Sequence, residues 1–154
     1  MSVEHNRAAV KLIVMLDPQL DPDRWELRSQ AGYVRWSERN AFIPDLMILP
    51  RALGDAQYAS GSVERYADPV PLVVEIRSPS TGEYDRGVKL AAYKARGDAE
   101  VWLLHPAAGF LQRWVRQPEG GYVESVHERG TIALAALPGV SVDLDALFAQ
   151  IEPR

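Results

Sequence analysis

The chain has 154 residues, 47% of them hydrophobic, so it can bury a substantial core, and we expect a single domain over residues 1–154. The absence of cysteine excludes disulfides, thiolate metal sites and a cysteine nucleophile. The net charge of −4 lacks the basic excess typical of nucleic-acid-binding proteins. No apolar run approaches the ~18 residues of a membrane span, and with the charged N-terminus this predicts a cytoplasmic protein with no membrane partner.

A helix and a hairpin are the first elements predicted along the chain. Apolar residues recur at helical spacing over residues 4–16, with Ser2 or Asn6 as the cap. Residues 25–30 and 33–37 flank an Ala-Gly pair and predict a β-hairpin. Arginines of this region, including Arg28 and Arg35, alternate with aromatic residues, a combination that can hold phosphates and stack on bases. A sheet edge with solvated charges is the simpler interpretation.

Two apolar strand candidates each carry one acid in the middle. Residues 42–49 contain Asp45, and residues 72–77 contain Glu75. Strand alternation places Glu75 on one face with Arg77. A buried carboxylate is costly unless it is paired or bound to a metal, and for either acid alone a salt bridge is the simpler interpretation. If the strands are neighbours, both acids converge on one point, where hard oxygen ligands would suit Mg²⁺ or Mn²⁺.

The stretches on either side of the second strand are predicted differently. Residues 50–71 show little periodicity, which indicates mainly a long surface connection with room for a short helix. A Ser-Pro turn then leads into a helix over residues 84–96, with capping-box spacing from Ser80 to Glu83. Its small side chains are expected to pack on the sheet, and its polar side chains to lie along another face. The small ones are Val88, Ala91, Ala92 and Ala95, and the polar ones include Asp85, Lys89, Tyr93 and Arg96.

The remainder of the chain is predicted to form strands followed by a short helix. Residues 99–104 predict a buried strand, and residues 110–115 and 122–127 a second hairpin around a Gly-Gly turn. A short strand over 131–135 and a helix over 143–150 complete the chain. The order of helix, strands, crossover helix and strands predicts an α/β domain with a mixed sheet.

The same residues resemble a known family. Pro44-Asp45 followed by Glu75-x-Arg77 matches the Pro-Asp…(Asp/Glu)-x-Lys pattern of the PD-(D/E)XK nuclease superfamily, with arginine in place of lysine. The run from Glu75 to Thr81 is more specific and is similar to the Uma-type family of restriction endonucleases. The resemblance covers about residues 41–106, and more loosely continues to about 140. The helix positions that the family shares are occupied here by Asp85, Lys89 and Tyr93.

This resemblance implies a restriction-endonuclease-like core that hydrolyses phosphodiester bonds in DNA with Mg²⁺ or Mn²⁺. Asp45, Glu75 and the backbone carbonyl of Ile76 would hold the metal, which lowers the pKa of its bound water and polarises the phosphate. Lys89 would take over from the missing motif lysine, because arginine is a poor proton acceptor. The expected catalytic residues are Asp45, Glu75, Lys89 and Arg77, and the expected contacts to nucleic acid are Arg28, Arg35 and Tyr93.

A protein of another class remains as the alternative, namely a catalytically weak or inactive nuclease-fold module that acts by binding or self-assembly. The acidic net charge favours it. Family members also carry an N-terminal glutamate that this sequence does not contain, for which Glu4 is a candidate substitute. His5 matches a family histidine, although a solvent or cap contact is simpler. An exposed ion pair is likewise the simpler role for Asp85 and Lys89. Exposed sheet edges in a short domain lead us to expect a homodimer.

Overall fold

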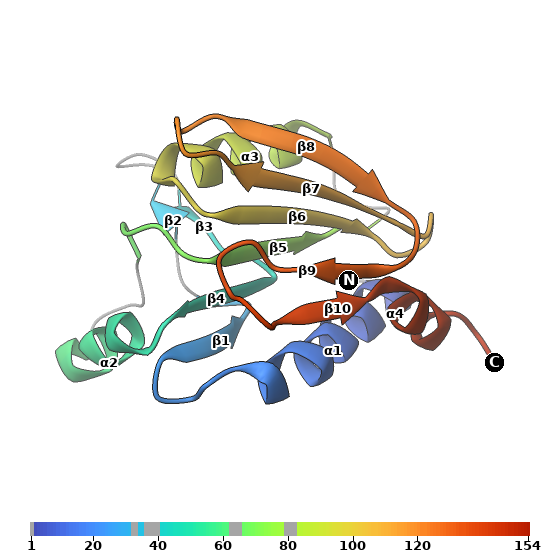
Figure 1. Ribbon diagram of the computed structural model, residues 1–154, viewed down its shortest axis with the longest axis horizontal. Coiled ribbons are helices and arrows are strands. Elements are labelled where there is room, and N and C mark those ends of the chain that lie inside the picture. The colour runs from blue at the N-terminus through green and yellow to red at the C-terminus, as the bar shows by residue number, and fades with distance from the viewer. Residues whose placement is uncertain (1, 32–33, 36–40, 62–65, 79–82) are drawn as a thin grey trace.

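A six-stranded mixed sheet forms the centre of the computed structural model (Figure 1). The structure describes residues 2–31, 34–35, 41–61, 66–78 and 83–154, apart from the side chains of 34–35, 41 and 83–86. The order of strands is β1-β4-β5-β6-β7-β8, in which β5 and β6 run parallel and the other neighbours antiparallel. These strands are β1 (Trp25–Ser29), β4 (Leu46–Pro50), β5 (Leu72–Ile76), β6 (Glu100–His105), β7 (Phe110–Arg116) and β8 (Tyr122–His127).

Helices cover both faces of this sheet, which confirms the predicted α/β class (Figure 1). Alternation along β5 sends Val74 to one core and Val73 to the other. The first core is closed by α1 and α4, and the second by α3, the crossover between the parallel strands β5 and β6. The helices are α1 (Val3–Leu16), followed by a 3-10 turn (Asp17–Gln19), α2 (Arg51–Ser60), α3 (Glu83–Arg96) and α4 (Leu144–Ile151).

The prediction of a hairpin over residues 25–37 is wrong. β1 pairs with β4 instead, with Leu27 opposite Ile48, while β2 (Val34–Arg35) pairs with β3 (Ala41–Phe42) in a separate small sheet. The reason is that Leu27 packs against the first core, so the long-range pairing buries an apolar side chain. A further small sheet joins β9 (Thr131–Ala133) to β10 (Ser141–Asp143).

The segment predicted mainly as a surface connection contains a ten-residue helix, α2. Gly61, with a φ of 62°, ends the helix in the left-handed conformation that glycine adopts without strain. Gly54 lies in its interior because Glu26 of β1 occupies the neighbouring space, 3.0 Å from where a Cβ would stand. Glu26 pairs with Arg51 at 3.0 Å. An interior glycine and an exposed Tyr58 weaken the apolar periodicity, which explains why the sequence leaves room for a short helix but does not locate it.

The remaining elements follow the predictions closely. Ser2 caps α1 by accepting a hydrogen bond from the backbone N–H of His5. β7 and β8 form the expected antiparallel pair, and the helix that closes the chain is α4 with Asp143 as its cap. The proposed Ser80–Glu83 capping box lies outside the described residues. Among the described residues, no helix is long and apolar enough to cross a bilayer.

A fully buried acid anchors the C-terminal end of α3. The two oxygens of Asp98 lie 2.7 and 2.8 Å from the guanidinium of Arg96, and the Val70 N–H donates to the same carboxylate at 3.1 Å. Burial raises the pKa of Asp98, although Arg96 opposes this shift. Removing one partner from such a pair costs ~3–5 kcal/mol. α3 is therefore held firmly against the segment before β5, which fixes the height of its side chains over the sheet.

Candidate active site

Asp45 and Glu75 face each other at the ends of two neighbouring strands. β4 pairs antiparallel with β5 with Leu46 opposite Val74, and one further step of this register brings Asp45 opposite Glu75. Opposite residues in an antiparallel pair point to the same face of a sheet. The backbone N–H of Ile76 donates to Asp45 Oδ2 at 2.7 Å, which fixes the orientation of that carboxylate. The sequence-predicted convergence of the two acids is thus present in the structure.

Two side chains of α3 reach the same oxygen of Glu75. Lys89 Nζ lies 3.5 Å from Glu75 Oε1, and the hydroxyl of Tyr93, one helical turn further on, donates to Oε1. Both come down onto the sheet from above because residues four apart share one face of a helix. The lysine is therefore largely buried, with 20% of its side chain exposed, and it reaches Glu75. The side chain of Asp85, its expected partner, lies outside the described residues.

The face of α3 that packs on the sheet differs from the predicted one. Ala91 and Ala95 of the small-residue face are exposed, whereas Ala92 and Tyr93 are buried. The polar face packs inward because Glu75 rises from the sheet beneath it and accepts a hydrogen bond from the Tyr93 hydroxyl. Tyr93 is 0% exposed and presents no surface to nucleic acid in this structure, so its role as a direct contact stays a prediction. Its hydroxyl donates a hydrogen bond to Glu75.

His5 is a site residue whose importance the sequence did not reveal. Its imidazole is buried, and Nε2 lies 3.1 Å from Asp45 Oδ1. Together with the Ile76 N–H on Oδ2, this contact holds both oxygens of Asp45. The Nδ1 atom of His5 is buried and has no hydrogen-bond partner among the described residues. Glu4, the candidate substitute for the family glutamate, is exposed on α1.

Burial raises the pKa of Glu75 to about 8. The ammonium group of Lys89 opposes this shift, whereas the neighbouring Asp45 adds to it by its charge and by a hydrogen bond between the two carboxyl groups. Without a cation, Glu75 therefore keeps its proton at neutral pH, because burial and the nearby Asp45 both disfavour its charged form. A divalent cation can replace that proton, so the pair fits a metal as a set of hard oxygen ligands.

The backbone around the two acids adds a third oxygen. If the pairing of β4 with β5 is continued by two residues, Pro44 lies opposite Ile76. Proline has no N–H, so Pro44 cannot donate a hydrogen bond to the Ile76 carbonyl. The N–H and C=O of a strand residue point to the same edge, and the N–H of Ile76 points towards Asp45. No group of three or more His, Asp or Glu side chains that could hold a metal occurs within the described ranges. Among the described residues, the candidate side-chain ligands are therefore Asp45 and Glu75, with the Ile76 carbonyl as a backbone candidate.

The raised pKa of Glu75 predicts a specific dependence of stability on pH. The unfolded chain releases this proton near the ordinary value of 4.5, whereas the folded protein keeps it to about 8. Wild type should lose stability across this window, by on the order of a few kcal/mol, relative to Glu75→Gln. Urea unfolding with a chelator present, at pH values below and above the window, measures the difference. A difference between the two proteins that stays constant with pH would contradict the assignment.

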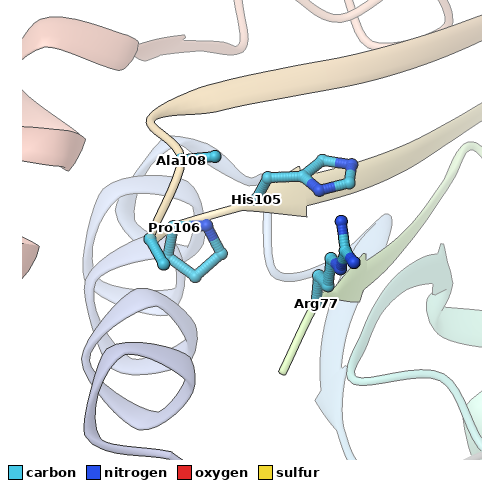
Figure 2. A pocket seen from close by; sticks show the side chains of 5 residues that line it. Arg77, His105, Pro106 and Ala108 are labelled. Atoms are coloured by element: carbon cyan, nitrogen blue, oxygen red, sulfur yellow. The ribbon is translucent and has the colours of Figure 1, made fainter. Parts of the chain in front are cut away.

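The predicted arginines lie apart from the two acids. Arg77, one residue beyond β5, is exposed and lines a pocket of about 210 Å³ with His105, Pro106, Ala107 and Ala108 (Figure 2). Arg28 pairs with Glu26 on β1 and is 38% exposed. The side chain of Arg35 lies outside the described residues. The structure therefore brings Asp45, Glu75, Lys89, Tyr93 and His5 together and leaves Arg77 at a neighbouring position.

A family model, Uma2, whose description reads "Putative restriction endonuclease", matches residues 1–146. The chain belongs to this family. No curated protein matches this Uma2 chain. Among solved structures it is similar to a crystal structure from Anabaena variabilis, described as "a putative nuclease", with a TM-score of 0.74 and 12% identity over 97% of this chain and 82% of that one. At this identity the likeness shows the fold. The recognised family and the restriction-endonuclease-like fold are thus both confirmed.

Proposed function

We propose that this Uma2 protein is a Mg²⁺- or Mn²⁺-dependent endonuclease that hydrolyses phosphodiester bonds in DNA. The observation that carries the proposal is the facing pair Asp45 and Glu75, with Lys89 Nζ 3.5 Å from Glu75. Membership of a family described as restriction endonucleases supports nuclease chemistry in general. The pair and the lysine support the metal-dependent form of that chemistry.

Asp45, Glu75 and the Ile76 carbonyl would hold the cation. When bound, it lowers the pKa of its water and withdraws negative charge from the attacked phosphate. Glu75 must give up its proton for this role, so metal affinity should rise with pH up to about 8. His5 and the Ile76 N–H keep the Asp45 carboxylate in one orientation. Binding a cation would therefore cost little conformational entropy at this side chain.

Lys89 is the residue best placed to act on the reacting groups. Its side chain is 20% exposed, so water only partly screens the charge of its ammonium group. This group would orient the attacking water and stabilise the charge that develops on the phosphate. Tyr93 donates to Glu75 from the same helix, so α3 fixes the position of Lys89 relative to the carboxylate that would hold the cation.

Thermal unfolding with and without Mn²⁺ tests the metal site directly. A cation that binds only the folded state at ~100 times its Kd adds about 2.7 kcal/mol, equivalent to an increase in Tm of roughly 5–10 °C for this chain length. Wild type should show this increase and Glu75→Ala should not. Glu128→Ala, which removes an exposed glutamate from the turn after β8, is the matched control and should respond as wild type does. An equal Mn²⁺-induced increase in Tm in all three proteins would contradict a metal site at Asp45 and Glu75.

A specific observation favours the alternative of an inactive module. Both carboxylates already have protein partners, since Asp45 binds His5 and the Ile76 N–H, and Glu75 binds Tyr93 and Lys89. The polar atoms of such a site have partners without a cation, as would suit a protein that acts by assembly. The edge strand β8 exposes Val123 and Val126 by 56% and 57%, a surface through which two copies could pair. This alternative predicts no Mn²⁺ response together with a dimer in sedimentation.

A further inference from the structure

The pocket beside the two acids is formed at the ends of the parallel strands. Ile76 of β5 stands beside Leu104 of β6, so the next residues along, Arg77 and His105, are neighbours. The Arg77 N–H donates to the Leu104 carbonyl at 2.8 Å, which fixes the start of the Arg77 side chain. Figure 2 shows the guanidinium directed towards the imidazole of His105, with Pro106 to one side of it. The pocket is thus lined by the exposed cationic side chain of Arg77 on one side and by His105 and the turn after it on the other.

His105 forms a rigid part of this wall. Its ring stacks on Phe110 with a centroid distance of 4.1 Å, and Nε2 lies 2.7 Å from Gln112 Oε1. The amide nitrogen of Gln112 donates to Glu124, so its oxygen must be the acceptor, and Nε2 of His105 must be the donor. The imidazole is therefore held in one orientation and cannot turn away from Arg77. The turn after it contributes the apolar side of the pocket.

Arg77 has no acidic partner within 4.0 Å among the described residues. This distinguishes it from Arg51, Arg96 and Arg113, each of which forms an ion pair with an acid. An arginine at a pocket mouth with no internal carboxylate is suited to an external anion, and its planar fork matches phosphate oxygens. Since the chain carries a net charge of −4, a polyanion must be attracted by local cations of this kind.

We infer that the Arg77–His105 pocket binds a backbone phosphate of the DNA strand, adjacent to the phosphate that lies over Asp45 and Glu75. The inference rests on the proposed function and adds a positioning site to it. Two residues along a strand span ~6.6 Å, so Arg77 stands about one nucleotide from Glu75 on the same face. Arg77 binds the phosphate oxygens, and Pro106 and Ala107 contact the apolar side of the deoxyribose. This contact would explain the arginine at the position of the motif lysine, because Arg77 would hold the DNA strand rather than the reacting water.

Binding of a short DNA duplex at several salt concentrations, with Ca²⁺ in place of the catalytic cation, tests this site. Arg77→Ala should lower the affinity about tenfold and reduce the slope of log affinity against log salt by about 1, as expected for one lost phosphate contact. Arg77→Lys should keep the slope. Arg129→Ala, an exposed arginine in the turn after β8, is the matched control and should bind as wild type does. Unchanged affinity and slope in Arg77→Ala would overturn the inference.

A second readout separates a strand phosphate from free phosphate. The chain has three histidines, so the imidazole NMR signals of His5, His105 and His127 can be assigned by substitution. The duplex should shift the His105 signal in wild type and not in Arg77→Ala. If inorganic phosphate shifts it but the duplex does not, the pocket is a free-phosphate site and the DNA assignment is wrong.

Cleavage kinetics keep this inference distinct from the proposed nuclease activity. If wild type cleaves DNA, Arg77→Ala should raise KM about tenfold with little change in kcat, because the contact is made equally in ground and transition states. Cleavage with an unaltered KM would overturn the pocket and leave the nuclease intact. Arg77-dependent duplex binding by a protein that never cleaves would support the pocket and overturn the nuclease.

Discussion

Glu75→Gln and Asp45→Asn should each reduce Mn²⁺-dependent nicking of supercoiled plasmid DNA by about a thousandfold. Each variant removes one hard oxygen ligand and leaves a neutral amide in its place, which weakens both the hold on the cation and its effect on bound water. The fold should survive, because the carbonyl oxygen of each new amide can still accept the hydrogen bond from Tyr93 or from the Ile76 N–H. Above about pH 8, Glu75→Gln should even unfold at a higher temperature than wild type, because folded wild type must then bury the charged Glu75 carboxylate.

Two neutralised surface acids provide controls for this experiment. Glu128→Gln and Asp68→Asn change the same chemical groups at exposed positions and should nick plasmid at the wild-type rate. The inactive variants, purified in parallel, also measure any contaminating nuclease. If Glu75→Gln or Asp45→Asn retains the wild-type rate, the nicking does not come from this pair of acids, and the inactive-module alternative becomes the better account.

The two acids could be found from the sequence because their signal is local. Each stands alone in an apolar, β-branched run, and period-two alternation fixes the face to which it points. Only the pairing of the strands had to be assumed, and β4 and β5 do lie side by side. Lys89 followed from the family resemblance, and helical spacing carries the lysine and Tyr93 to the same side.

The features that the sequence does not reveal depend on contacts between segments that are distant along the chain. His5 meets Asp45 across forty positions of chain, and the periodicity of α1 cannot say what its first turn will touch. The sequence places Tyr93 on a helix face away from the sheet, because a face with a lysine and an arginine is ordinarily solvated. That face is buried here because the buried carboxyl group of Glu75 below it needs a hydrogen-bond donor. In the same way, the Ala-Gly pair gave a local hairpin signal that lost to the pairing of β1 with β4.

Lys89→Met should reduce the rate of plasmid nicking about a hundredfold or more, with the fold intact. Two effects of the substitution must be separated. The lysine charge lowers the pKa of Glu75, so its loss should raise that pKa beyond about 8 and weaken the Mn²⁺-induced increase in Tm near neutral pH. The lysine would also act directly on the phosphate or the attacking water. Lys11→Met, on the helix that covers the other face of the sheet, is the control and should change neither quantity.

A pH series distinguishes these two roles of Lys89. At a pH above the pKa that Glu75 has in Lys89→Met, Glu75 is ionised in both proteins. Mn²⁺ should then stabilise Lys89→Met as well as it stabilises wild type. If nicking remains slow there, the lysine acts on the reacting groups and is catalytic. If the rate returns to the wild-type value, the lysine only keeps Glu75 ready for the cation, and the catalytic role proposed for it is wrong. Because the cation and the lysine converge on one carboxylate, only a measurement of both metal binding and rate can assign the effect to either.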